Sequence, residues 1–231
     1  MSSRFACPLA VKVVIMDLDG TLVDTAPDIA ASTNAMLQDL GLPTHDQDTI
    51  ATWIGSGASR LVRRALTEAM DGEPPKDVYE QAYRLFLQQY GERVSRESRS
   101  YPGVIEALAA LQATGFGLAC ITNKPDVFTT RLLKDLELHG YFELIVSGDT
   151  LTARKPDPLP LLHACEYFGV APEHGVLVGD SANDIEAAHA AGMPVICVTY
   201  GYNRGVNVRE LDPAAVIDSL TELPTYIRPY R

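Results

Sequence analysis

The chain has 231 residues, of which 46% are hydrophobic and 21% charged, so it can bury a substantial core in one domain or slightly more. Its 30 acidic and 19 basic residues give a formal net charge of −11. Nucleic acids and anionic membranes bind basic surfaces, so neither is expected as a partner, although a local site could still receive a small anion. No apolar run approaches the ~20 residues of a membrane span, and we expect a cytoplasmic protein, monomeric or homodimeric.

The first predicted strand spans 11–17 and is followed by acidic residues. Its sequence, VKVVIMD, is an almost continuous apolar run, typical of a strand buried on both faces of a parallel sheet. Asp17 and Asp19 should lie where this strand ends, because a strand interior does not accommodate carboxylates. Two neighbouring carboxylates repel each other, so a positive group is expected beside them.

Residues 24–100 are predicted to form a small all-helical cap domain, inserted after the first strand. The segments with helical periodicity are 27–41, 59–70 and 76–94, and no strand pattern lies between them. The segment 96–103 has the composition of a linker that returns to the core.

From residue 101 onward, strand and helix patterns alternate. The predicted strands are 117–123, 143–149, 175–180 and 194–199. The predicted helices are 103–114, 126–138, 156–168 and 182–191, followed by the candidate helix-terminal glycines Gly115, Gly140, Gly169 and Gly192. This alternation predicts an α/β core with a doubly wound, Rossmann-like parallel sheet, made of residues 1–23 and 101–231.

Several of the predicted strands and loops carry polar residues at the edge where such sheets bind ligands, which is the carboxyl end of the strands. These residues are Thr122 and Asn123 after the second strand, Lys155 in a loop, and Asp180 and Asp184 after the fourth strand. Each has a plain structural alternative, such as a turn or a helix cap. Their convergence on one edge favours a functional site.

The residue types at this edge suit phosphate chemistry. Asp17, Asp19 and Asp180 offer the oxygen ligands that Mg²⁺ prefers. Lys155 and the Thr122 hydroxyl offer a positive charge and a donor to an oxyanion. Asp17 is then a candidate nucleophile that forms an aspartyl-phosphate, with Mg²⁺ and Lys155 offsetting the charge repulsion. Asp19 could protonate the leaving alkoxide and then accept a proton from the attacking water.

Four segments resemble the motifs of the haloacid dehalogenase-like phosphohydrolases: DLDGTLVDT, ITN, RKPDP and GDSANDIEAAHAAG. The resemblance covers essentially the whole chain and places the helical insert at the position of that family's cap. It implies that Asp17 is the nucleophile and Asp19 the acid/base. It also implies that Thr122, Asn123 and Lys155 hold the phosphoryl oxygens, and that Mg²⁺ binds the Asp17 carboxylate, the Asp19 backbone carbonyl and Asp180, with support from Asp184.

The segments TWIGSGASRLVRRAL, CITNKPDVF and VTYGYNRG most resemble the bacterial phosphoglycolate phosphatases within that family. This resemblance implies 2-phosphoglycolate, a small phosphorylated carboxylic acid, as the substrate. A phosphatase acting on sugar phosphates or other small phosphomonoesters, or a β-phosphoglucomutase-like phosphotransferase, shares the same motifs and remains an alternative. A non-catalytic phosphate-binding protein is disfavoured, because it would need neither Asp17 nor Asp19.

The segment GSGASR, residues 55–60, is the candidate substrate-selecting part of the cap. Gly55 and Gly57 would let the backbone approach a ligand closely. Ser59 is predicted to cap the following helix. Arg60 and Arg64, one turn apart on the same face, could receive the substrate carboxylate, or could simply be solvated surface charges.

Overall fold

Within residues 7–203 and 205–230, which this computed structural model describes, six parallel strands form the central sheet in the order β6-β5-β2-β7-β8-β9. They are β2 (Val13–Met16), β5 (Gly117–Ile121), β6 (Leu144–Val146), β7 (Gly175–Gly179), β8 (Val195–Val198) and β9 (Ala215–Ile217). The chain proceeds from β2 through β5 to β6, then crosses to β7 on the other side of β2. Ligands of such sheets bind at the carboxyl ends of the strands beside this reversal.

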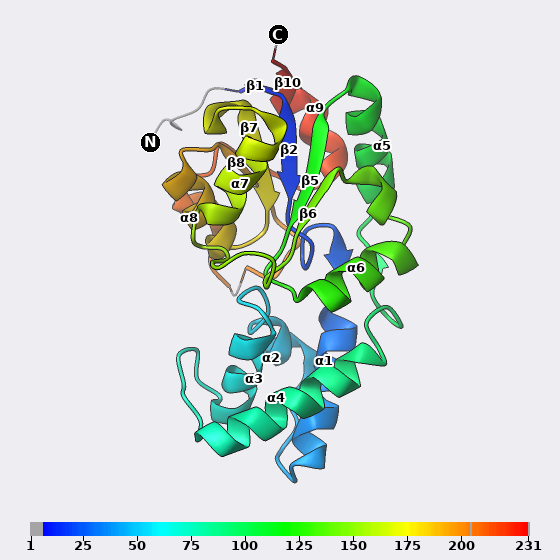
Figure 1. Cartoon of the computed structure of the whole chain (residues 1–231), viewed down its shortest axis with the longest axis vertical. Coiled ribbons are helices and arrows are strands. Elements are labelled where there is room, and N and C mark those ends of the chain that lie inside the picture. Colours follow the sequence, from blue (N-terminus) through cyan, green and yellow to red (C-terminus); the bar gives the residue numbers. More distant parts are fainter. Residues whose placement is uncertain (1–6, 204, 231) are drawn as a thin grey trace.

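Helices cover both faces of the sheet (Figure 1). They are α5 (Val104–Thr114), α6 (Asp126–Asp135), α7 (Leu159–Phe168) and α8 (Ala182–Ala191). Successive residues of β2 point to opposite faces: Val14 and Met16 join the apolar cluster that contains α5 and α6, whereas Val13 and Ile15 join that of α7 and α8. The continuous apolar runs are therefore explained by burial on two faces, and the predicted doubly wound α/β core is confirmed.

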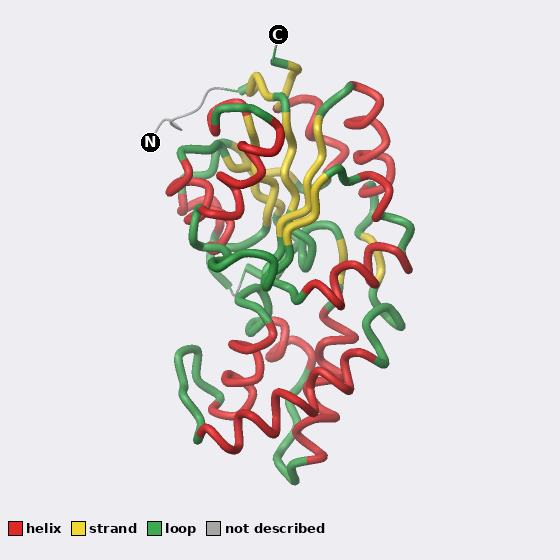
Figure 2. Tube along the Cα trace, in the orientation of Figure 1, coloured by secondary structure: helices red, strands yellow, loops and turns green. Residues whose placement is uncertain are grey.

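The helical insert lies beyond the carboxyl ends of the strands, and loops at those ends separate it from the sheet (Figures 1 and 2). Its helices are α1 (Ala26–Asp39), α2 (Gln47–Ala51), α3 (Ala58–Thr67) and α4 (Lys76–Gly91), and α1 packs against the other three. The chain enters through β3 (Val23–Asp24) and returns through β4 (Arg99–Ser100), which pair antiparallel. We propose a cap domain of residues 24–100 on a core of 1–23 and 101–231, residues 1–6 being outside the described part.

The first predicted strand is divided in two. β1 (Leu9–Val11) pairs with β10 (Ile227–Pro229), whereas β2 belongs to the central sheet. The exposed Lys12 lies at a bend between them. The remaining short elements are η1 (His139–Tyr141), η2 (Pro172–His174), η3 (Val208–Leu211), η4 (Leu220–Glu222) and α9 (Leu223–Tyr226). Among the described residues, no helix combines the length and apolarity needed to cross a membrane.

One predicted helix end is wrong. Gly115, Gly169 and Gly192 end helices in left-handed conformations, as expected. Gly140 instead lies within η1, after α6 has ended near Leu136. At this helix end, Glu137 adopts the left-handed conformation, with φ 59°, that was predicted for a glycine.

Candidate active site

Asp17 and Asp19 lie directly after β2, at the carboxyl edge of the sheet. The Asp17 N–H donates to the Val178 carbonyl at 2.9 Å, which extends the pairing between β2 and β7. Gly20 then turns the chain with φ +90°, and a Cβ at this position would lie 2.5 Å from Asp180 Oδ2. The turn therefore requires glycine. Both aspartates are buried in the resulting loop.

Three buried carboxylates meet at this edge. Asp17, Asp180 and Asp184 each offer an oxygen within 4.8 Å of the other two. Lys155 Nζ lies 2.8 Å from Asp17 Oδ1 and 2.7 Å from Asp184 Oδ1. The Thr21 hydroxyl donates to Asp180 Oδ1 at 2.9 Å. The single charge of Lys155 does not balance three carboxylates.

The pKa values of these groups reflect burial first and the charges of their neighbours second. Burial raises the pKa of Asp17 to about 7, against the lowering effect of Lys155. Burial, followed by repulsion from Asp184, raises the pKa of Asp180 well above its usual range. Burial alone would lower the pKa of Lys155, but Asp17 and Asp184 raise it above its ordinary value. The lysine is thus held charged by Asp17 and Asp184, whereas Asp180 accepts only from the uncharged Thr21 hydroxyl and Tyr202 N–H among the described residues.

The donor set fits a hard divalent cation such as Mg²⁺. The carboxylates of Asp17 and Asp180 present the oxygen ligands that this ion prefers, and the charge shortage is one that it would relieve. Asp184 is already engaged: one oxygen accepts from the lysine ammonium, and the other accepts from the Ser181 N–H at 3.1 Å and hydroxyl at 2.7 Å. Asp184 is therefore suited to orienting the cluster rather than to binding the ion directly.

The Asp19 carboxylate is outside this cluster and has different partners. Its Oδ1 accepts from the Thr25 hydroxyl at 2.7 Å and from Lys124 Nζ at 2.8 Å. Lys124 is buried, and its ammonium lies 4.7 Å from the ring centroid of Tyr90. Burial would lower the pKa of Lys124, but Asp19 and Tyr90 raise it above its ordinary value. This lysine is absent from the predicted site, although its place directly after the polar pair of ITNKP was an available signal.

Thr122 and Asn123, the polar pair after β5, make hydrogen bonds within the protein, which the sequence did not predict. The Thr122 hydroxyl accepts from the Lys124 N–H at 3.2 Å. Asn123 Nδ2 donates to the Lys155 carbonyl at 2.8 Å and to the Gly55 carbonyl of the cap at 2.9 Å. Asn123 Oδ1 is buried and accepts no hydrogen bond. The amide thus joins the lysine loop to the cap, and the predicted role of Thr122 and Asn123 in holding phosphoryl oxygens stays a prediction.

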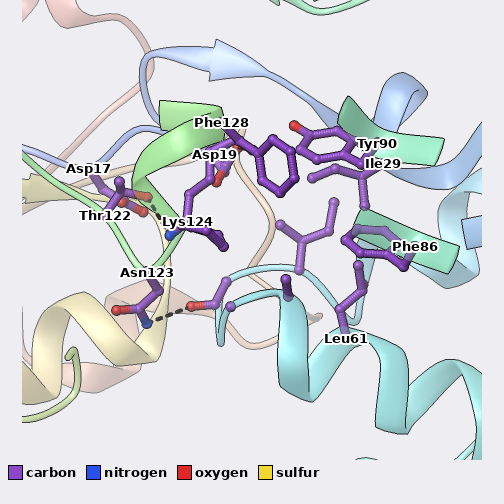
Figure 3. Close-up of a pocket in the computed structure, with 15 residues that line it drawn as sticks. Asp17, Asp19, Ile29, Leu61, Phe86, Tyr90, Thr122, Asn123, Lys124 and Phe128 are labelled. Carbon is purple, nitrogen blue, oxygen red and sulfur yellow. Dashed lines mark hydrogen bonds and ion pairs between the residues drawn. The ribbon is translucent and has the colours of Figure 1, made fainter. Parts of the chain in front are cut away.

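A pocket lies between the core and the insert (Figure 3). Its core wall carries the polar groups, namely Asp17, Asp19, Thr122, Asn123 and Lys124, with Pro125 and Phe128. Its insert wall carries Ile29, Ile54, Gly55, Gly57, Ala58, Leu61, Phe86 and Tyr90. Figure 3 shows Leu61 and Phe86 across the pocket from Lys124 and Asp19. A ligand here would place its reactive end on a charged wall and the rest against apolar side chains.

Ser59 is not the N-cap residue of helix α3, contrary to the prediction. Helix α3 begins at Ala58, one residue before Ser59, and its N-cap is Gly57. The Ser59 and Tyr79 hydroxyls are instead hydrogen-bonded at 2.7 Å. Gly57 has φ +84°, which a serine or threonine at the N-cap would rarely adopt, so the glycine fixes where the helix begins.

Arg60 and Arg64 of α3 face other partners. Arg60 Nη1 lies 3.1 Å from Glu73 Oε1, at an exposed position. Arg64 is buried and donates to the Trp53 carbonyl at 2.9 Å and the Met70 carbonyl at 3.0 Å. Neither side chain lines the pocket. The structure therefore brings Gly55 and Gly57 to the site, but not the guanidinium groups predicted to select the substrate.

An acid pair after the first central strand, a lysine and further acids at the same sheet edge, and a helical insert over them together define a class of protein. The family model of the haloacid dehalogenase-like hydrolases matches residues 14–198. The chain belongs to this family.

Individual relatives are similar over nearly the whole chain. The phosphoglycolate phosphatase of Thiobacillus denitrificans is 57% identical over 215 residues, which is 93% of this chain and 95% of the relative. That of Nitrosospira multiformis is 51% identical over 221 residues, covering 96% and 97%. The crystal structure of a predicted phosphoglycolate phosphatase from Haemophilus somnus superimposes with a TM-score of 0.88 at 38% identity, covering 93% and 96%.

Proposed function

We propose that this protein is a Mg²⁺-dependent phosphatase that converts 2-phosphoglycolate to glycolate and phosphate. The observation that carries the proposal is the placement of Asp17 and Asp19 on the pocket wall, with Asp17 also part of the acidic cluster, in a chain 57% identical to a phosphoglycolate phosphatase. We further propose that it acts in the cytoplasm on small phosphorylated carboxylic acids, as a monomer or homodimer.

In the first step, an Asp17 carboxylate oxygen attacks phosphorus and the ester bond to the glycolate oxygen breaks. Lys155, 2.8 Å from Asp17 Oδ1, lies where it can offset the negative charge that both reactants bring to the buried site. Asp19 gives its proton to the departing alkoxide. The product of this step is an aspartyl-phosphate and free glycolate.

In the second step, water attacks the aspartyl-phosphate and releases inorganic phosphate. Asp19, now ionised, accepts the proton of that water, which restores both aspartates to their starting forms. Thr25, which donates to Asp19 at 2.7 Å, keeps the carboxylate oriented through both steps. The apolar insert wall limits access of bulk water to the intermediate.

Mg²⁺, held by the Asp17 and Asp180 carboxylates and the Asp19 backbone carbonyl, would supply positive charge to the phosphoryl oxygens and the nucleophile. Asp184 would keep Lys155 in place beside them, since its Oδ1 accepts from the lysine ammonium at 2.7 Å.

A sugar-phosphate substrate fits the pocket less well. The hydroxyls of a sugar need hydrogen-bonding partners, because an unpaired polar group in a buried site costs about 1–3 kcal/mol. The side chains facing the site from the insert are mainly apolar, including Ile29, Leu61 and Phe86. This lining suits a short two-carbon substrate better than a polyhydroxylated ring.

The test is a substrate panel with Mg²⁺ present. We expect kcat/KM for 2-phosphoglycolate to exceed the values for glucose 6-phosphate and pyrophosphate, and no conversion of β-glucose 1-phosphate to glucose 6-phosphate. A higher kcat/KM on a sugar phosphate, or measurable mutase activity, would overturn the proposed substrate.

A further inference from the structure

We propose that Lys124 is the residue that selects the substrate, by binding the carboxylate of 2-phosphoglycolate with its ammonium group. The inference rests on the proposed function and names the residue that gives it specificity.

Lys124 brings a positive charge to the wall of the pocket. Among the described residues that line it, no other side chain is positively charged. The lysine itself is almost completely buried, so its charge is not lost to bulk solvent. A carboxylate that enters between this wall and the apolar insert wall leaves water, which is costly unless a cation receives it. Lys124 is positioned to receive it.

The location of Lys124 also matches the covalent structure of the substrate. In 2-phosphoglycolate, the carboxylate is separated from the ester oxygen by a single methylene. The ester oxygen must lie near Asp19, which donates a proton to it. Lys124 Nζ lies 2.8 Å from Asp19 Oδ1. A group one methylene beyond the ester oxygen is therefore expected within reach of this ammonium.

The ammonium has donor capacity for a second carboxylate. A lysine carries three N–H donors. One points to Asp19, and the face of the Tyr90 ring lies 4.7 Å away. Asp19 also accepts from the Thr25 hydroxyl at 2.7 Å, so it keeps a partner if Lys124 moves toward the substrate. The flexible lysine stem permits such a movement.

Arg60 and Arg64 compete poorly for this role. Arg60 lies against Glu73, and Arg64 donates to the Trp53 and Met70 carbonyls. Figure 3 places Lys124 on the pocket wall beside Asp19.

The test compares two non-hydrolysable inhibitors that differ in one group. In 3-phosphonopropanoate a methylene replaces the ester oxygen of 2-phosphoglycolate, and in propylphosphonate a methyl group also replaces the carboxylate. We expect the wild-type protein, with Mg²⁺, to bind 3-phosphonopropanoate more tightly. Lys124→Met should raise the Kd of 3-phosphonopropanoate roughly tenfold to a hundredfold, which is the effect of one lost charge-assisted hydrogen bond. The Kd of propylphosphonate should be almost unchanged.

Thermal unfolding followed by circular dichroism shows whether the variant is folded. If Lys124→Met fails this control, Lys124→Gln replaces it, since glutamine keeps a donor beside Asp19 but carries no charge. Arg60→Ala is the matched control and should keep the preference for 3-phosphonopropanoate.

The outcomes separate the two proposals. Equal weakening of both inhibitors would mean that Lys124 serves Asp19 and the phosphate end only, and a retained preference in the variants would mean that another group binds the carboxylate. Either result overturns the role of Lys124 while the phosphatase proposal stands. A wild-type protein that shows no preference and does not hydrolyse 2-phosphoglycolate would overturn the proposed function itself.

Discussion

Asp17 and Asp19 are two positions apart, but the chain gives them different surroundings. Asp17 faces Lys155 and the acidic cluster, whereas Asp19 faces Thr25 and Lys124 on the pocket wall. The first environment suits attack on a phosphoryl group held by positive charge, and the second suits proton exchange with a leaving group.

The residue substitutions that test these roles are Asp17→Asn and Asp19→Asn. Asp17→Asn should abolish turnover, because an amide is a poor nucleophile. Asp19→Asn should lower kcat by about 10²–10⁴, the usual contribution of general acid–base catalysis. Phosphate release gives the rates, and acid quenching with radiolabelled substrate detects the phosphoenzyme, which Asp19→Asn should still form slowly. Near-native turnover by Asp17→Asn would exclude the covalent mechanism.

The metal requirement is the second prediction at this scale. EDTA should abolish the catalytic activity, and added Mg²⁺ should restore it. Asp180→Ala should raise the Mg²⁺ concentration for half-maximal activity by at least about tenfold, because a ligand carboxylate is lost. Asp218→Ala is the control, because the Asp218 carboxylate is exposed and accepts a hydrogen bond from the Thr199 hydroxyl. Its Mg²⁺ concentration for half-maximal activity should equal that of the wild type. Full activity after exhaustive chelation would contradict the prediction.

At the scale of elements, the start of α1 depends on a residue from the other end of the chain. The N-cap residue Thr25 makes no side-chain cap. The Tyr202 hydroxyl instead accepts from the N–H groups of Thr25 at 2.7 Å and Ala26 at 2.8 Å, and donates to Asp24 Oδ1 at 2.6 Å. The Tyr202 N–H also donates to Asp180 Oδ2. One residue thus links the acidic cluster to the entry of the insert.

Tyr202→Phe should therefore destabilise the protein without creating a cavity, because only the hydroxyl is removed. The loss of a helix cap costs about 0.5–2 kcal/mol, which for a chain of this size corresponds to a Tm lowered by about 2–4 °C per kcal/mol. Thermal unfolding followed by circular dichroism measures the change. Tyr141→Phe, on η1, is the control. An unchanged Tm for Tyr202→Phe would show that water or the backbone satisfies the same N–H groups equally well.

The sequence could predict the elements but not all of their contacts. Strands buried on two faces leave continuous apolar runs, and polar residues at their ends must share one sheet edge, which predicts the positions of Asp17 and Asp180. The Arg60–Glu73 ion pair and the capping of α1 by Tyr202 each join segments that are separate in the sequence. The periodicity within a segment does not show which other segment it will contact. Lys124 directly follows the polar pair, which was a signal for the site, but the sequence does not show which wall of the pocket its side chain faces.

At the scale of the whole molecule, one contact between the insert and the core is made by the Gly55 carbonyl, which lies beside the pocket. Gly55 O accepts from Asn123 Nδ2 at 2.9 Å and from Asn183 Nδ2 at 3.0 Å. The approach is close at Gly57 as well, where a Cβ would lie 2.9 Å from the Asn123 carbonyl oxygen. On the opposite side of the pocket, the ring centroids of Tyr90 in the insert and Phe128 in the core lie 4.9 Å apart. The chain connects the two parts through the paired strands β3 and β4.

This construction predicts that the cap opens and closes as a body about β3 and β4, and that Asn183 biases it toward the closed form. Asn183→Ala removes the hydrogen bonds to the Gly55 carbonyl and, at 3.4 Å, to the Ser56 hydroxyl. At about 0.5–1.5 kcal/mol for each bond, the closed-to-open ratio should fall by roughly fivefold to a hundredfold. Small-angle scattering should show a larger radius of gyration for the ligand-free variant than for the wild type, and Mg²⁺ with 3-phosphonopropanoate should make both compact. Asn207→Ala, on the side of the core that carries η3, is the control and should scatter as the wild type does. Superimposable curves for the wild type and Asn183→Ala, with and without ligand, would mean that the cap is fixed and that substrate enters without its movement.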